Sequence, residues 1–204
     1  MVEASNNCSE LPKKFLSSSA SGYFGDRGEE KLIESSKEGE DFLAEVCVKW
    51  EDATKKISKN IELIIFRTGI VLHPDGGALE QILKPMKYYV GGALGKGNQY
   101  FCWIHVADWK RFLIFALEKN GNSQINNLCS PNPVTNNVLT QAIGKVYKRP
   151  TLFKVPSFIL KLVLGESASM VLSSQRMMPE NILEANFRFE YELIEKAIIN
   201  LKKV

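Results

Sequence analysis

Cysteine and histidine are scarce in this chain of 204 residues, which contains four cysteines and two histidines. The four cysteines (Cys8, Cys47, Cys102 and Cys129) lie far apart, and the sequence contains no Cys-x-x-Cys pair and no cysteine–histidine cluster. This spacing argues against a metal site and against a disulfide framework. We therefore expect no bound metal and a reducing, cytoplasmic location.

An excess of charge of one sign is also lacking, as is a long hydrophobic run. The 26 basic and 23 acidic residues leave a net charge of +3 and are interleaved, so we expect neither nucleic acid nor a membrane surface as partner. The longest apolar run, residues 153–164, is interrupted by lysine, proline and serine and is too short to span a bilayer. Residues 1–10 are polar and acidic, which is not the pattern of a signal peptide.

What the chain does contain is an alternation of strand and helix patterns. Apolar residues at three- and four-residue steps predict helices, and β-branched runs predict strands. A strand, a helix and a strand in succession over residues 13–72 predict a βαβ unit, and therefore an α/β fold with a parallel sheet. The predicted strands are 13–20, 61–72, 103–106 and 123–128, and the predicted helices are 40–57, 78–89, 109–117, 136–147, 156–164 and 191–203.

Several local features of these elements are also predicted. Asp108 and Thr135 are expected to cap the helices that follow them, and residues 21–36 are expected to form a loop. The apolar stripe of helix 40–57, which includes Phe42, Val46 and Trp50, is expected to face the core. From residue 150 the pattern changes, so we expect two parts, 1–149 and a small, mainly helical lobe over 150–204.

Two glycine clusters have the look of phosphate-binding loops. Gly22, Gly25 and Gly28 have the spacing of a dinucleotide loop, but acidic residues occupy the place where phosphates would lie, and no long apolar helix follows. We therefore interpret this motif as a coincidence of spacing. Residues 91–97 do not match a P-loop and are interpreted as a flexible loop beside a pocket.

Polar side chains at strand ends are the candidate site residues, because ligands bind at the carboxyl ends of parallel strands. The serines at 17–19 either face a substrate, with Tyr23 nearby, or simply cap the strand end. Arg67 either binds an anion or pairs with a carboxylate such as Glu45 or Glu51. His105 is either a general base or a hydrogen-bonded structural residue.

Several segments in this order resemble one family. They are SSSASGYFGD (17–26), DFLAEVCVKWE (41–51), LIIFRTGIVL (63–72), GKGNQYFCWIHVADW (95–109), CSPNPVTN (129–136) and SSQRMMPENILEANFRFEY (173–191). Together they resemble the atypical epimerase branch of the short-chain dehydrogenase/reductase superfamily, with its C-terminal domain of unknown function.

The resemblance implies a Rossmann-like fold that binds NADP and a small-molecule substrate. By resemblance, Ser19 matches the serine or threonine at the end of the central strand, and Gly69, Ile70 and Val71 match the stretch that contacts the nicotinamide end of the cofactor. Ser19, with Tyr23 a few residues later, is therefore the catalytic candidate. Trp103 and His105 match the family's segment that faces the pocket, and with Arg67, from its place at a strand end, they are the substrate-pocket candidates.

The sequence departs from the superfamily in two respects. Members begin with a strand and a GxTGFxG loop, in a stretch of about a hundred residues that this sequence does not match, so we expect a partial Rossmann-like sheet with an exposed edge through which the chain could associate. The catalytic Tyr-x-x-x-Lys pair is also missing, because no tyrosine here has a lysine four residues later. The function expected is an NADP-linked, sugar-nucleotide epimerase-like or oxidoreductase-like protein. The alternatives are a non-catalytic regulatory protein of the cell-division-inhibitor type and a shortened gene product with little function of its own.

Overall fold

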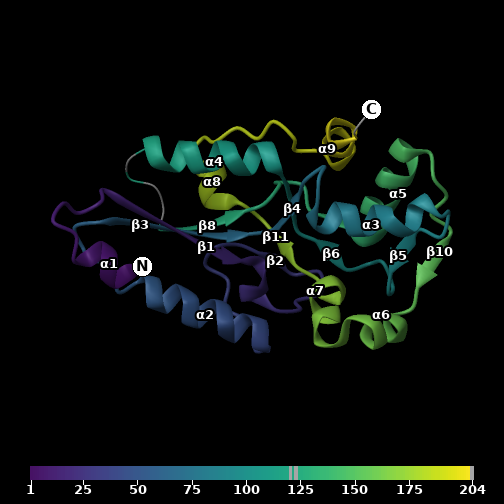
Figure 1. Cartoon of the computed structure of the whole chain (residues 1–204), viewed down its shortest axis with the longest axis horizontal. Helices are drawn as coiled ribbons and strands as arrows, with labels where there is room; N and C mark the ends of the chain where they lie inside the picture. Colours follow the sequence, from purple (N-terminus) through teal and green to yellow (C-terminus); the bar gives the residue numbers. More distant parts are fainter. Residues whose placement is uncertain (120, 122–123, 203–204) are drawn as a thin grey trace.

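A three-stranded parallel sheet organises the chain in the computed structural model, which describes residues 1–119, 121 and 124–202. Its strands are β1 (Lys14–Ala20), β3 (Glu62–Thr68) and β8 (Ile125–Leu128), in the order β1-β3-β8 (Figure 1). The register runs from Lys14 opposite Glu62 to Ala20 opposite Thr68. The predicted α/β, Rossmann-like class is confirmed, whereas Ser123 of the predicted strand lies outside the described residues.

Helices cover both faces of this sheet. Helix α2 (Phe42–Thr54) links β1 to β3 on one face, and Asp41 caps it by accepting from the Ala44 amide at 2.9 Å. Helices α4 (Val106–Glu118) and α8 (Glu180–Glu184) lie on the opposite face (Figure 1). There Ile64 and Phe66 of β3 pack against the inner residues of α4 and α8 in a buried apolar cluster.

The predicted strand over 61–72 is in fact two strands. It breaks at Gly69, after which β4 (Ile70–Leu72) leaves the main sheet and pairs in parallel with β7 (Trp103–His105). A side chain at position 69 would place its Cβ 2.6 Å from the Cys102 Sγ, so only glycine fits this crossing point.

The expectation that the apolar stripe of helix 40–57 faces the core was wrong. Phe42 is 72% exposed and Trp50 is 58% exposed, whereas α2 buries Ala44, Glu51 and Thr54. The helix therefore turns a partly polar face inward, because Glu51 has a buried partner on β3.

The expected capping role of Asp108 was also wrong. Helix α4 begins at Val106, and the His105 side chain caps it by accepting from the Ala107 amide at 3.0 Å. Asp108 lies inside the first turn and accepts from the amides of Glu190 and Tyr191, each at 2.8 Å. Thr135 does cap its helix, α5 (Asn136–Tyr147), as predicted.

Two predicted loops contain short regular elements. Residues 21–36 include the 3-10 helix η1 (Ser21–Phe24) and strand β2 (Lys31–Leu32), which pairs with β11 (Arg176–Met177). The interpretation of residues 91–97 as a flexible loop was wrong, since β5 (Gly92–Leu94) pairs with β10 (Phe153–Val155). The other elements are α1 (Val2–Asn6), α3 (Gly77–Lys87), β6 (Tyr100–Phe101), β9 (Val134–Thr135), α6 (Ser157–Leu164), η2 (Gly165–Ala168), α7 (Ser169–Leu172) and α9 (Ile194–Leu201).

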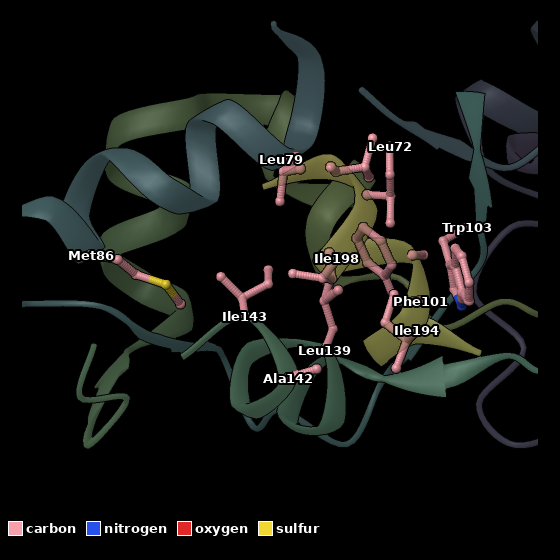
Figure 2. Close-up of a cluster of buried hydrophobic side chains, with 12 residues drawn as sticks. Leu72, Leu79, Met86, Phe101, Trp103, Leu139, Ala142, Ile143, Ile194 and Ile198 are labelled. Atoms are coloured by element: carbon pink, nitrogen blue, oxygen red, sulfur yellow. The ribbon is translucent and has the colours of Figure 1, made fainter. Parts of the chain in front are cut away.

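The largest apolar cluster draws on residues from both sides of position 150. Figure 2 shows Leu139 and Ile143 of α5 meeting Ile194 and Ile198 of α9, with Trp103 at the side. This core therefore contains residues of both predicted parts, 1–149 and 150–204, and the division into these parts remains a prediction. Within the described residues, no helix is both long and apolar enough to cross a bilayer.

Candidate functional site

A buried ion pair lies at the carboxyl ends of β1 and β3. The Arg67 Nε and one terminal nitrogen each donate to a different oxygen of Glu51, both at 2.9 Å, and both side chains are at most 2% exposed. The other terminal nitrogen donates to the Glu34 carbonyl at 3.1 Å. This two-point geometry fixes the guanidinium plane and the carboxylate together. Of the two alternatives for Arg67, the pairing with Glu51 is confirmed.

The serine run divides between the two faces of the sheet. Ser19 donates from its hydroxyl to the Glu51 carboxylate at 2.8 Å and is buried, and Ser17 accepts from the Trp50 indole at 3.3 Å. Ser18 points to the other face, where its Oγ lies 3.4 Å from the Thr68 hydroxyl. The Ser19 hydroxyl proton is thus directed into the ion pair.

Tyr23 lies in the 3-10 helix that follows β1 and contacts the network formed by Ser19, Glu51 and Arg67. The Arg67 guanidinium carbon lies 3.3 Å from the centre of the Tyr23 ring, and the Tyr23 hydroxyl donates to Glu38 at 3.3 Å. Partial burial raises the pKa of Tyr23, and the Arg67 charge opposes this effect. Tyr23 is therefore protonated at neutral pH and can act as a proton donor.

Glu34 is a buried residue of this region that sequence reasoning missed. Its Oε1 accepts from the backbone amides of Asn127, at 2.9 Å, and Asn181, at 3.3 Å. Burial raises its carboxyl pKa, and the bond from Asn127 opposes the rise. In the sequence, Glu34 is a glutamate in a polar segment, and nothing in that segment distinguishes a buried glutamate from a solvent-exposed one.

The three predicted cofactor contacts lie just beyond Arg67. The Gly69 amide donates to the Leu128 carbonyl at 3.0 Å, and the Ile70 amide donates to the Cys102 carbonyl at 2.8 Å. Ile70 and Val71 are only partly buried. The main chain at 69–71 is thus held rigidly next to the ion pair, and its contact with a cofactor remains a prediction.

The other two predicted pocket residues lie in the interior. Trp103 is fully buried and donates from its indole to the Asn132 carbonyl at 3.2 Å. The His105 ring stacks on Tyr191 with 3.9 Å between ring centres, and burial lowers the His105 pKa, opposed by the charge of Asp108. Both therefore face packed side chains, and their role toward a substrate remains a prediction.

A cavity of about 560 Å³ borders the network at Phe24 and Glu38. Its polar lining has more acidic than basic residues, namely Asp26, Glu38, Glu40 and Asp41 against Arg27 and Lys37. A cavity with this surplus of carboxylates suits the hydroxyl groups of a ligand better than its phosphates.

The Gly22–Gly25–Gly28 segment, which lies beside this cavity, does not form a phosphate cradle. The Gly25 amide donates to the Gly22 carbonyl at 3.1 Å, and the Arg27 amide donates to the Ser174 carbonyl at 3.0 Å. The Gly28 amide faces the Asp26 carboxylate at 3.4 Å. These amides are already used, so this segment does not suit a pyrophosphate. Among the described residues, no group of three or more His, Cys, Asp or Glu side chains could hold a metal ion.

Comparison with known proteins identifies several relatives. Residues 155–201 match the model of a domain of unknown function, DUF1731. The chain is 37% identical to the "Epimerase family protein SDR39U1 homolog, chloroplastic" of Arabidopsis thaliana, over 92% of this chain and 54% of that protein. It is 30% identical to the epimerase family protein SAR0825 of Staphylococcus aureus, over 98% of this chain and 68% of that protein. The chain thus spans between about half and two thirds of the length of these relatives.

Solved structures agree with these matches. The crystal structure of the human epimerase family protein SDR39U1 (isoform 2) with NADPH superposes with a TM-score of 0.94 at 27% identity, over 98% of this chain and 68% of that one. A nucleoside-diphosphate sugar epimerase from Corynebacterium glutamicum superposes with a TM-score of 0.75 at 30% identity, over 97% of this chain and 39% of that one.

Proposed function

We propose that this chain, which belongs to the epimerase family of proteins, forms the substrate-facing wall of an NADP-linked epimerase or oxidoreductase that acts on a nucleotide sugar. The observation that carries the proposal is the stack of Tyr23 on the Arg67–Glu51 ion pair, at the carboxyl ends of two parallel strands. Ligands of open α/β sheets bind at this position. The NADPH of the human relative and the substrate class named for the Corynebacterium protein support the choice of chemistry.

In this proposal the residues of the network have distinct roles. NADP, when bound, supplies or accepts hydride. The protonated Tyr23 hydroxyl donates a proton to the sugar carbonyl oxygen, and Arg67 stabilises the phenolate that is left behind. Ser19 holds the Glu51 carboxylate, which fixes Arg67 in turn. Tyr23 would thus do, from the loop after β1, the work that the missing Tyr-x-x-x-Lys pair does elsewhere.

Replacement of Tyr23 by phenylalanine is expected to reduce turnover by about 100-fold or more, the usual contribution of a positioned proton donor. The measurement is NADPH oxidation with UDP- and dTDP-keto-sugars at saturating NADPH, or epimer formation with UDP- and dTDP-sugars at saturating NADP+. Tyr147→Phe is a matched control, because Tyr147 is a partly buried tyrosine of α5 that packs against the large apolar cluster.

An unchanged rate in Tyr23→Phe would remove this residue from the proposed chemistry. Should the unaltered protein turn over none of these sugars while still binding one of them, the alternative of a non-catalytic regulatory protein would replace an enzymatic role. The four cysteines are unpaired in the structure, which supports placing either protein in a reducing compartment such as the cytoplasm.

We also propose that the face formed by β1 and α2 is an association surface. Within the described residues β1 pairs only with β3, so its outer edge has free backbone groups. Phe42, Val46 and Trp50 are exposed at four-residue steps along α2, and the Trp50 indole reaches Ser17 of β1. The unpaired edge and the apolar stripe are therefore neighbours, as expected of a face that another segment or polypeptide covers.

The chain is expected to self-associate through this face, and Phe42→Glu should raise the dissociation constant by about tenfold or more, since burial of a phenylalanine contributes about 1.5–3 kcal/mol. Light scattering over a concentration series measures the effect. Ile199→Glu, at an exposed position on α9, is the control. A monodisperse monomer at high concentration would contradict the proposal.

A further inference from the structure

Two segments without a single acidic residue meet at one end of the molecule. Residues 84–101 contain three lysines, residues 145–164 contain five lysines or arginines, and neither stretch has an Asp or Glu. Parallel pairing of β5 with β10 joins the two segments, with Gly92 opposite Phe153. Figure 1 shows β5, β10, α5 and the end of α3 together at this end of the fold. A chain whose charges balance overall thus has a strongly basic end.

Most of the positive charge at this end is not neutralised. Lys84 lies 3.5 Å from Glu80, and Lys145 lies 3.1 Å from Glu195. The other basic side chains described here make no ion pair within the described part of the chain; these are Lys87, Lys96, Lys148, Arg149 and Lys154. Their field is available to a partner of opposite charge.

Large apolar side chains protrude beside these cations. Leu152 is 86% exposed, Leu162 is 84% exposed, and Tyr88 is 80% exposed; Phe158 and Phe153 are exposed on the same segments. Scattered apolar residues are normal on a surface, but four of these five lie within residues 152–162, on or beside strand β10 and helix α6. We call this set of basic and apolar side chains the basic-apolar end.

A cavity lies within the basic-apolar end, where α5 finishes. It has a volume of about 520 Å³ and is lined by Lys145, Lys148, Arg149 and Leu152, among others. The Arg149 guanidinium carbon lies 4.4 Å from the centre of the Tyr89 ring, which holds this cation beside an exposed aromatic residue. The cavity thus presents cations to an anionic ligand, with the exposed Leu152 in its lining.

We propose that the basic-apolar end docks on an anionic lipid bilayer. Lys148, Arg149 and Lys154 lie against the lipid phosphates, and Leu152 inserts between the lipid acyl chains. Cationic residues next to exposed aromatic and aliphatic side chains are the composition that binds such an interface. A second copy of this chain is a poor occupant, because it would bring like charges together. Nucleic acid would leave the leucines without an apolar partner.

This inference concerns a property of the fold apart from catalysis. The sequence alone predicted no membrane surface, because the charges were judged over the whole chain. The local excess emerges only when strand pairing joins segments that lie about 60 residues apart.

Co-sedimentation with vesicles tests the proposal. The chain is expected to bind phosphatidylcholine vesicles that contain about 30% phosphatidylglycerol, and to bind pure phosphatidylcholine vesicles at least tenfold more weakly. Lys148→Gln combined with Lys154→Gln should weaken binding by about 25-fold, since each cation near an anionic surface contributes about fivefold. Leu152→Glu should weaken binding by about tenfold or more.

Matched controls separate the basic-apolar end from charge in general. Lys56→Gln with Lys59→Gln removes the same net charge from exposed positions between α2 and β3, and Leu117→Glu makes the same exchange on α4. Both controls should bind like the unaltered chain. Binding of the unaltered chain should also fall steeply as salt is raised, which needs no variant.

Three results would overturn the proposal: equal binding to both vesicle types, equal losses in the control variants, and binding to single-stranded RNA with none to vesicles. Because Leu152, Lys148 and Lys154 are exposed, circular dichroism should show that all variants fold.

Discussion

Replacement of Glu51 by alanine is expected to destabilise the folded chain by about 3–5 kcal/mol, because it leaves Arg67 charged, buried and without its carboxylate. The Ser19 hydroxyl would lose its acceptor in the same variant. Urea denaturation followed by circular dichroism measures the loss. This single substitution has the largest predicted effect on stability.

Two further variants test whether the broken ion pair causes the loss of stability in Glu51→Ala. Glu45→Ala removes an exposed carboxylate from the same helix, where it pairs with Lys49, and should destabilise the chain far less than Glu51→Ala. Glu51→Leu combined with Arg67→Met removes both charges and should restore much of the stability. If Glu51→Ala unfolds no more readily than Glu45→Ala, the ion pair does not have the structural role described here.

The second large effect concerns the cofactor. The chain on its own is expected to bind NADPH at least about 100-fold more weakly than the human relative, whose crystal structure contains NADPH. A charge-assisted hydrogen bond contributes about 1.5–3 kcal/mol, so the absence of two contacts to the phosphates already accounts for this factor. The amides of Gly25, Arg27 and Gly28 cannot replace them, because they bind protein oxygens.

Isothermal titration calorimetry of both proteins under the same conditions measures this difference. Gly28→Ala is an informative variant, because a Cβ at position 28 meets no atom within 4 Å, although the backbone there is left-handed. We expect this variant to leave the weak affinity unchanged. Micromolar binding by the unaltered chain, lost in Gly28→Ala, would show that residues 22–28 do hold the pyrophosphate.

The sequence predicted the longer helices and the strands of the main sheet, because their patterns are local, but not the short strands and helices. The strand–helix–strand order, the Thr135 cap and the parallel sheet all follow from residues close together in the chain. The inward face of α2 could not be predicted in this way, because it depends on Glu51 meeting Arg67 across the sheet. Asp108 was misjudged for the same reason, since the amides that it binds lie more than 80 residues away.

The candidate site was predicted in part. Topology alone placed Ser19 and Arg67 at one edge of the sheet, and Glu51 was one of two carboxylates considered for Arg67. Glu34 gave no signal, because a buried glutamate in an irregular segment has no periodicity to mark it. The burial of Trp103 and His105 depends on the packing of α9 and Tyr191, which only the folded chain shows.

The close approach of Gly92 to Phe153 affects how the basic-apolar end could change in evolution. A Cβ at position 92 would collide with the Phe153 carbonyl oxygen, so any other residue there must push β5 away from β10. One uncharged substitution at this point would therefore separate the five unpaired cations of the two segments without altering any of them. The proposed binding to anionic surfaces could therefore be lost in a relative that keeps every lysine and arginine but has a side chain at the position of Gly92.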